Sequence, residues 1–249
     1  ANDLTFFEQA TLLAVLVFAR AETEAVVLEV GLGGRLDATS AVAADVAVIT
    51  QVALDHQALL GDTLASIARE KAGIVRAGQS VVLGPGESQA LLCGAVRARE
   101  PVQIVCARRD RLPDGWVVGL VGEHQRENAA TALAALDVFA QVTGRSVPAG
   151  AAQKGLASVR WPGRLEHIAE GVWLDVEHNP DGLQRVAREF ARASVTWVLG
   201  VSADKDLAAL VGALIGANAH ALVATQGTSP RALGAGVLAA AIRGAGLPL

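Results

Sequence analysis

The sequence predicts an α/β fold in which mostly parallel strands alternate with helices. Two short segments, 25–30 and 45–50, are almost continuously apolar, which is typical of strands buried on both faces of a parallel sheet. Longer segments with helical spacing of apolar residues, such as 124–142, follow them along the chain. The alternation of the two patterns indicates helices packed in layers on sheets.

The expected elements form two series. The first series is a helix over 6–20 with a capping box from Thr5 to Glu8, strands over 25–30 and 45–50, a helix over 62–71, a strand near Val81, a helix over 88–97, strands near Ile104 and Val117, and a helix over 124–142. The second series is a strand over 172–175, a helix from Asp181, a strand over 195–199, a helix from Leu207, a strand over 221–224 and a helix from Arg231. A Gly/Pro-containing stretch that ends at 161–164 separates them. We therefore expect two domains, residues 1–160 and residues 161–249.

The composition excludes several classes of protein. The 249 residues carry a formal net charge of −4 with scattered basic residues, so we expect no nucleic-acid partner. Apolar residues make up 52% and charged residues 18%, which excludes a disordered chain. The two cysteines lack metal-ligand spacing, which favours a reducing compartment and a cytoplasmic protein. The longest apolar stretches, 10–19 and 207–217, are shorter than the roughly 20 residues that a membrane-spanning helix needs, so no membrane association is expected.

Polar residues follow the first two expected strands. Glu29 lies at the end of one strand, and Asp55 and His56 follow the other. Ligands of open parallel sheets bind at the carboxyl ends of strands, where a carboxylate and an imidazole could hold Mg²⁺ or transfer protons. Glu29 could instead form a salt bridge at a strand end, and His56 could be a hydrogen-bonded loop residue.

Lys71 lies on the apolar side of its expected helix, because Leu64, Ile67 and Ala68 precede it by seven, four and three residues. A buried lysine loses hydration energy unless it has a partner. Its side chain either extends to solvent along the apolar surface or has a functional role. The spacing does not decide between these two interpretations.

The glycine-rich segment 31–37 follows an expected strand and is similar to a dinucleotide-binding turn. The third glycine of that fingerprint would fall at Leu36, and no acidic residue ends the next strand. The sequence therefore excludes a Rossmann dehydrogenase. A glycine turn that only permits positive φ remains an alternative.

The second series also has polar strand ends. Asp175 ends a strand, and segment 177–180 leads into a helix. Asn179 and Pro180 could be no more than a turn and a helix start. Segment 204–206 and Arg231 could likewise be charged helix entries.

Nine segments in order along nearly the whole chain carry a family resemblance. They are 4–8, 28–39, 54–56 with 60–63, 67–74, 124–128, 161–164, 174–180, 204–206 and 229–232. Together they resemble the folylpolyglutamate synthase and dihydrofolate synthase branch of the Mur ligase superfamily. The resemblance implies a truncated P-loop-type central domain with a mostly parallel sheet over 1–160, and a smaller Rossmann-like glutamate-ligase domain over 161–249.

The resemblance also implies an activity. A carboxylate of dihydropteroate, of a folate polyglutamate or of both would be phosphorylated by ATP, and the amine of L-glutamate would attack the acyl phosphate. The implied cofactors are ATP and Mg²⁺, and the implied protein is a cytoplasmic monomer that acts on small molecules. Glu29 and His56 match the Mg²⁺ ligands of the family, and Lys71 matches a lysine that the family carries as a carbamate.

Further site residues follow from position in the matched segments. Residues that match ATP-binding positions are Asn128, Arg164, Asp175 and His178. Residues that match the dihydropteroate pocket of the bifunctional bacterial enzymes are Thr5, Phe7, Arg35 and Asp37. Glu177 departs from the small residue usual in the family and would add negative charge near ATP.

A second departure concerns the glycine-rich loop with Lys and Ser/Thr that cradles ATP phosphates in the family. No Gly-Lys pair occurs in the sequence, which begins with Ala and contains no Met. The chain is therefore expected to be a fragment or an incompletely represented sequence that lacks catalytic activity by itself. Two alternatives remain: another Mur-type amino-acid ligase, or a non-catalytic folate-binding paralogue or fragment.

Overall fold

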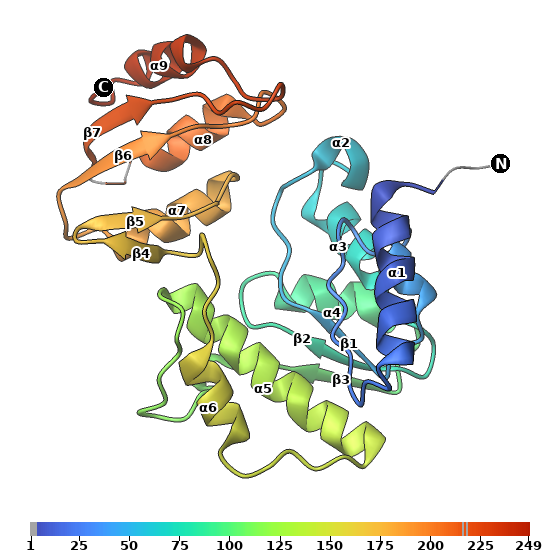
Figure 1. Ribbon diagram of the computed structural model, residues 1–249. Coiled ribbons are helices and arrows are strands. Elements are labelled where there is room, and N and C mark those ends of the chain that lie inside the picture. Colours follow the sequence, from blue (N-terminus) through green and yellow to red (C-terminus); the bar gives the residue numbers. More distant parts are fainter. Residues whose placement is uncertain (1–3, 216, 218) are drawn as a thin grey trace. The chain divides into compact units, whose positions relative to one another are not determined.

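The structure is a computed structural model that describes residues 4–215, 217 and 219–249 (Figure 1). Helices alternate with strands, most of them parallel, so the predicted α/β fold class is confirmed. The chain divides into two compact units, Ala1–Asp114 with Glu127–Ala152, and Gly115–Arg126 with Gln153–Leu249. The predicted boundary at 160/161 falls within the second unit, and the assignment of separate roles to the two parts stays a prediction.

The first unit is built around a three-stranded parallel sheet in the order β1-β2-β3. Its elements are α1 (Phe6–Arg20), η1 (Ala38–Ala41), β1 (Val46–Ile49), α2 (Gln57–Leu60), α3 (Leu64–Ala72), β2 (Ser80–Leu83), α4 (Gln89–Arg97), β3 (Gln103–Cys106), η2 (Arg109–Arg111) and most of α5 (Glu123–Thr143). Ile49 pairs with Leu83, and Leu83 pairs with Cys106. The carboxyl ends of the three strands therefore meet at one edge of the sheet.

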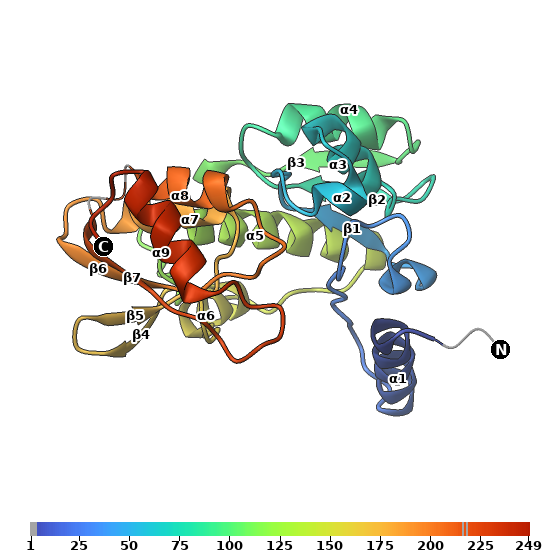
Figure 2. The same cartoon turned by 90° about the horizontal axis from the view of Figure 1, so that it is seen from above.

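Both faces of this sheet are covered, which explains why β2 is buried throughout. Val81 and Leu83 contact the cluster that α3 and α4 build on one face, in which Ile67 is also buried. Val82 points to the opposite face, where it belongs to a buried cluster with Val138 of α5. Figure 2 shows α5 on the side of this sheet away from α3 and α4. Each such side chain stabilises the fold by about 1.5–3 kcal/mol.

The remaining chain forms a hairpin and a second parallel strand pair. Its elements are α6 (Ala151–Ser158), β4 (Glu166–Ala169), β5 (Val172–Leu174), α7 (Pro180–Glu189), β6 (Val195–Leu199), α8 (Leu207–Leu214), β7 (Ala219–Ala224) and α9 (Ala235–Gly244). β4 and β5 are antiparallel, whereas β6 and β7 are parallel. Trp197, Leu222, Leu238 and Ile242 are buried in the core of the second unit, between the parallel pair and its helices.

The prediction of a strand over 25–30 is wrong. The segment is irregular, and Val27 is 95% exposed. A strand needs a hydrogen-bonded neighbour, and no strand in the described ranges pairs with these residues. The apolar α1 beside it in sequence also has no buried side chain. None of the helices in the described residues is long and apolar enough to cross a membrane.

Three further elements differ from the sequence prediction. The strand expected near Val117 is absent from this described segment, which is irregular, and α6 and β4 form where no element was expected. The last helix begins at Ala235 and not at Arg231. The reason is that the Ala232 amide donates to Ser229 in a turn, and Ala232 also bridges to Ser202.

Gly84→Ala tests the packing at the carboxyl edge of the sheet. A β-carbon at Gly84 would clash with the carbonyl oxygen of Thr50, and the Gly84 amide already donates to Ile49 at 2.9 Å. Since the backbone would have to shift, we expect the free energy of unfolding to fall by about 1–3 kcal/mol in chemical denaturation.

Gly94→Ala in α4 is the matched control. No atom lies near the position of the added carbon, and alanine favours a helix over glycine by about 1 kcal/mol. This variant should be as stable as the unmodified protein or slightly more stable. Equal destabilisation by the two substitutions would contradict the packing assigned to Gly84.

Candidate active site

One carboxylate organises the glycine turn that precedes η1. Oδ2 of Asp37 accepts hydrogen bonds from the amides of Gly31 and Leu32 at 2.9 and 3.1 Å. Its Oδ1 accepts from the amide and the hydroxyl of Thr39 at 2.9 and 2.6 Å. Asp37 therefore fixes the backbone of the turn, and its predicted contact with a pterin stays a prediction.

These hydrogen bonds set the charge state of Asp37. Burial acts to raise the pKa of Asp37, but the hydrogen bonds from Thr39, Leu32 and Gly31 together outweigh it and hold the pKa below its usual value. The folded protein thus favours the ionised carboxylate more strongly than the unfolded chain does.

The start of α1 lies against the same turn. A β-carbon on Gly31 would lie 2.8 Å from the Phe7 ring, so only glycine allows this approach. Thr5 caps α1: its hydroxyl accepts from the Glu8 amide at 3.3 Å, and its amide donates to the Glu8 carboxylate at 2.7 Å. The predicted capping box is confirmed, whereas the placement of Thr5 and Phe7 in a pterin pocket stays a prediction.

The other side of the turn packs on the end of α3. A β-carbon on Gly34 would lie 2.8 Å from the carbonyl oxygen of Glu70 and 2.9 Å from that of Lys71. The Arg35 amide donates to the Glu70 carbonyl at 3.0 Å, and the Arg35 guanidinium pairs with the Glu70 carboxylate at 3.1 Å. A substrate that binds Arg35 would therefore compete with this ion pair.

Lys71 is half-buried at this contact. Ile67 and Ala68 are buried, as their helical spacing predicts, whereas Leu64 is 41% exposed. Burial lowers the pKa of Lys71, and the negative charge of Asp55 acts in the opposite direction. At any given pH, a larger fraction of Lys71 is therefore the neutral amine than for an exposed lysine.

His56 immediately precedes α2, as its N-cap residue, in a left-handed backbone conformation with φ of 52°. Its amide donates to Asp55 Oδ1 at 2.8 Å, and its Nε2 lies 3.9 Å from the same oxygen. The last residue of α2, Leu60, contacts the glycine turn, since a β-carbon on Gly33 would lie 2.8 Å from its side chain. The turn, α2 and the end of α3 are thus packed together.

Glu29 is exposed and precedes Gly31 by two residues. Its convergence with His56 and Lys71 on one ion stays a prediction. The chemistry of the donor set suits a divalent cation, because carboxylate oxygen and imidazole nitrogen are common ligands of Mg²⁺ and of transition metals. A carbamate on Lys71 would add oxygen donors, and the lowered pKa of Lys71 favours the neutral amine that such a modification requires.

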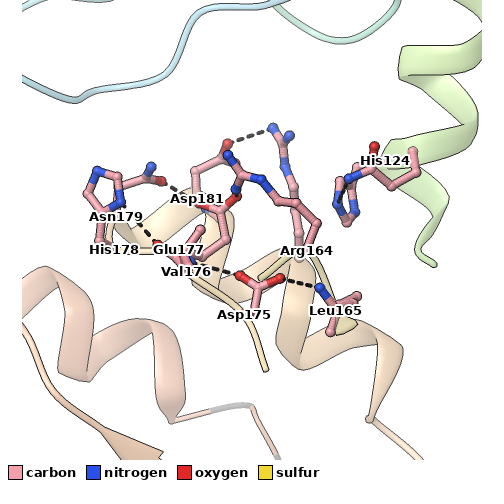
Figure 3. Close-up of polar contacts among 12 residues, drawn as sticks. His124, Arg164, Leu165, Asp175, Val176, Glu177, His178, Asn179 and Asp181 are labelled. Carbon is pink, nitrogen blue, oxygen red and sulfur yellow. Dashed lines mark hydrogen bonds and ion pairs between the residues drawn. The ribbon is translucent and has the colours of Figure 1, made fainter. Parts of the chain in front are cut away.

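A second polar cluster lies in the second unit (Figure 3). Oδ2 of Asp175 accepts from the amide of Leu165 at 2.8 Å, and its Oδ1 accepts from the amide of Glu177 at 2.7 Å. Leu165 has a left-handed φ of 43°, which is unusual for a residue with a branched side chain. Asp175 therefore ties the segment after β5 to a strained segment before β4.

Arg164 donates to the carboxylate of Glu177 at 2.8 Å. The other carboxylate oxygen of Glu177 lies over Gly182, where a β-carbon would clash with it. Asn179 caps α7 by accepting from the Gly182 amide at 2.9 Å, and Pro180 is the first residue of the helix. The helix start predicted at these two residues is confirmed, and the unexpected charge of Glu177 has Arg164 as its partner.

His124 is a candidate residue that the sequence analysis did not single out. Burial lowers the pKa of His124, as does the charge of Arg185, while Glu189, Glu177 and Asp175 oppose the shift. The buried Nδ1 of this ring has no hydrogen-bond partner among the described residues. A histidine at the start of a long expected helix was the available signal, but Arg185 and Glu189, whose charges act on it, lie on α7, far along the sequence.

The other predicted residues take simpler positions. His178 is exposed, and its Nδ1 lies 3.2 Å from the carbonyl oxygen of Val176. Asn128 is exposed on α5. Asp206 caps α8 by accepting from the Ala209 amide at 3.0 Å, which confirms the alternative that it is a helix entry.

Asp37→Asn tests the role of the carboxylate in the turn. An amide nitrogen cannot accept hydrogen bonds, so two of the four are lost, and we expect about 1–2 kcal/mol less stability at pH 7. Because the pKa of Asp37 is lowered on folding, its contribution is present above the unfolded value of about 3.9 and is lost as pH falls through the folded value. Denaturation curves from pH 7 to pH 3 should show the two proteins converging in acid. A stability difference that is constant over this range would contradict the prediction.

The chain is similar in sequence and in structure to known proteins. The dihydrofolate synthase/folylpolyglutamate synthase of Mycobacterium tuberculosis is 37% identical over 270 residues, which cover 94% of this chain and 55% of that protein. The structure of Escherichia coli FolC in complex with DHPP and ADP has 31% identity and a TM-score of 0.83, and covers 99% of this chain and 62% of that chain.

A further solved structure, of a bifunctional folylpolyglutamate synthase/dihydrofolate synthase with Mn, AMPPNP and L-glutamate bound, has 33% identity and a TM-score of 0.82. It covers 96% of this chain and 61% of that one, so the chain spans only part of the length of its relatives. No protein-family model matches the chain. Over the part that it spans, the chain belongs by sequence and by fold to the folylpolyglutamate synthase/dihydrofolate synthase family.

Proposed function

We propose that the protein takes part in the ATP-dependent ligation of L-glutamate to dihydropteroate, to folate polyglutamates or to both, through an acyl phosphate. The observation that carries the proposal is the match over nearly the whole chain to enzymes solved with ADP and DHPP, or with AMPPNP and L-glutamate. The proposed partners are therefore small molecules. A cytoplasmic monomer is the proposed form. The two free cysteines support a reducing compartment.

In the first unit, Glu29 and His56 are the proposed ligands of a divalent ion. A bound Mg²⁺ would supply positive charge to the phosphate oxygens during transfer. The Asp55 carboxylate accepts a hydrogen bond from the His56 amide at 2.8 Å, which fixes the backbone from which the imidazole extends.

Lys71 is proposed to act as a carbamate. Its neutral amine would form a nitrogen–carbon bond with CO₂ and release one proton, which changes a cation into an anion beside the metal ligands. Burial supports this step, because it lowers the pKa of Lys71 and increases the fraction of neutral amine. The carbonyl of the same residue lies against Gly34, so its backbone position is fixed by the glycine turn.

Three of the four residues proposed for the nucleotide belong to the second unit. Arg164, Asp175 and His178 are proposed to bind ATP, together with Asn128 of α5. Since Arg164 is paired with Glu177 at 2.8 Å, its guanidinium is oriented before any nucleotide binds. Asp175 contributes by fixing the backbone on both sides of this pair.

The pterin carboxylate is proposed to bind near the glycine turn. Thr5, Phe7, Arg35 and Asp37 are the proposed binding residues. The observed contacts suggest different roles for these residues. Phe7 is an aromatic residue that is 40% exposed, and the Arg35 guanidinium could exchange the Glu70 carboxylate for a substrate carboxylate. Thr5 and Asp37 are occupied in capping α1 and the turn, and so would shape the pocket indirectly.

Incorporation of labelled L-glutamate by the full-length protein tests the activity. Dihydropteroate, a folate polyglutamate and a muramyl peptide are offered separately with ATP and Mg²⁺, and release of phosphate is measured in parallel. We expect glutamate incorporation into at least one acceptor with equimolar phosphate. Ligation to a muramyl peptide alone would favour another Mur-type ligase, and folate binding without turnover would favour a non-catalytic paralogue.

Lys71→Ala tests the carbamate. If the modified lysine takes part in phosphoryl transfer, kcat should fall by at least about 100-fold, the range seen when a charged group at a reacting centre is lost. The kcat of Lys71→Arg should fall equally, because arginine keeps the positive charge but cannot form the carbamate. Added bicarbonate should rescue neither variant.

Arg69→Ala is the matched control for Lys71. Arg69 lies on the same helix but is exposed, so its loss should leave turnover near normal. Circular dichroism and thermal unfolding establish that each variant is folded. Near-normal ligation by folded Lys71→Ala would refute the catalytic role.

Arg164→Gln tests the nucleotide assignment. Losing a charged hydrogen-bond donor to phosphate or ribose should raise the Kd for ATP by roughly 10-fold or more. Calorimetric titration with ATP measures this change, and Arg188→Gln on the exposed side of α7 is the control. Equal ATP affinity in the Arg164 variant and the control would remove Arg164 from the proposed site.

A further inference from the structure

The only two cysteines of the chain come from elements that meet at the carboxyl edge of the first sheet. Cys93 lies in the middle of α4, and Cys106 is the last residue of β3. β3 is the edge strand of the sheet, and its last residue pairs with Leu83 of β2. Neither the proposed metal ligands nor the proposed nucleotide residues include these thiols.

The face of α4 that carries Cys93 is directed to the end of β3. Gln89 precedes Cys93 by one helical turn, and its Nε2 donates to the carbonyl oxygen of Ala107 at 2.9 Å. The same amide group donates to the carbonyl oxygen of Gly84 at 3.0 Å. Gln89 therefore anchors this face of α4 at the residue that follows Cys106.

Arg97 and Cys93 lie on the same face of α4 as Gln89. Arg97 lies one turn after Cys93, and its positive charge acts on the Cys106 thiol. Cys93 packs against the buried cluster that includes Ile104 of β3 as a peripheral member. Cys106 follows Ile104 by two residues along β3, so its side chain points to the same face of the sheet, the face against which α4 and Cys93 pack.

The neighbouring thiol and guanidinium affect the charge state of Cys106. Burial raises the pKa of the Cys106 thiol, Cys93 raises it further, and the positive charge of Arg97 acts in the opposite direction. Cys106 is exposed as a residue and Cys93 is half-buried. A small oxidant therefore reaches Cys106 first, and Cys93 is placed to react second.

We propose that Cys93 and Cys106 form a redox-modification site that closes to an intramolecular disulfide with a low-molecular-weight disulfide as oxidant. The Cys106 sulfur attacks the reagent, whose sulfur–sulfur bond breaks and releases one thiol. The Cys93 sulfur then attacks the mixed disulfide, forms the bond to Cys106 and releases the second thiol. The protein loses two protons and two electrons, which reduce the reagent to two thiols.

The bridge would join α4 to the edge strand across a loop of 12 residues, since 93 and 106 differ by 13. A crosslink across a loop of this size restricts the unfolded chain. We expect the Tm of the oxidised protein to be higher by roughly 5–10 °C. Reduction with a dithiol should return the Tm to its starting value.

Oxidation of the full-length protein with oxidised glutathione tests the proposal. Trypsin cuts after Arg76, Arg97, Arg99 and Arg108, so the cysteines fall in separate peptides, 77–97 and 100–108. We expect these two peptides to appear joined by a disulfide in mass spectra of the oxidised protein and separately after reduction. Glutathione adducts on both cysteines with no joined peptide, or a disulfide-linked dimer of the chain, would overturn the proposal.

Cys93→Ser and Cys106→Ser are the matched variants, and each should lose both the joined peptide and the oxidation-dependent rise in Tm. Because Cys93 is half-buried, Cys106→Ser on the exposed side provides the test if the other variant does not fold. In Cys106→Ser, Cys93 should react with the reagent at least about 10-fold more slowly than Cys106 does in Cys93→Ser, since only exposed thiols react readily. A rise in Tm on oxidation of either variant would also overturn the proposal. Ligase activity is not the readout, so the outcome is independent of the proposed function.

Discussion

The close approach of the glycine turn to the end of α3 is the contact on which the first unit's candidate site depends. Gly34 lies so near the carbonyl oxygens of Glu70 and Lys71 that a side chain at this position would push the turn away. The turn carries Arg35 and Asp37, and α3 carries Lys71. The position of three proposed functional residues therefore rests on the absence of one β-carbon.

Asp37 keeps this contact rigid from within the turn. Its four accepted hydrogen bonds occupy both carboxylate oxygens, so the carboxylate is charged, partly buried and fully used by the protein itself. Asp175 plays an equivalent part in the second unit, where it accepts from the amides of Leu165 and Glu177. In both units a carboxylate that looks like a ligand in the sequence holds backbone in place, which is how a scaffold positions other side chains for chemistry.

The sequence was a good guide where a signal is local. The continuous apolar run over 45–50 identified β1, and the Thr5, Asn179 and Asp206 caps identified helix starts, because the residues that cause these structures are neighbours in sequence. The strand expected over 25–30 failed because a strand also needs a partner, which periodicity does not reveal. The ion pairs of Arg35 with Glu70 and of Arg164 with Glu177, and the burial of His124, likewise depend on residues brought together only by folding.

The charges around Arg164 and around Lys71 affect these two proposed site residues in different ways. Arg164 and Glu177 neutralise each other at 2.8 Å, so an anionic nucleotide that binds Arg164 must share it with a carboxylate. Lys71 has the reverse arrangement: burial weakens its proton affinity, while Asp55 strengthens it. Converting this amine to an anion would remove the attraction to Asp55 and replace it with repulsion, unless a cation binds between them. A divalent ion between the two groups would offset this repulsion, so the proposed carbamate and the proposed ion would stabilise each other. Arginine, which cannot form a carbamate, could not take part in this coupling at position 71.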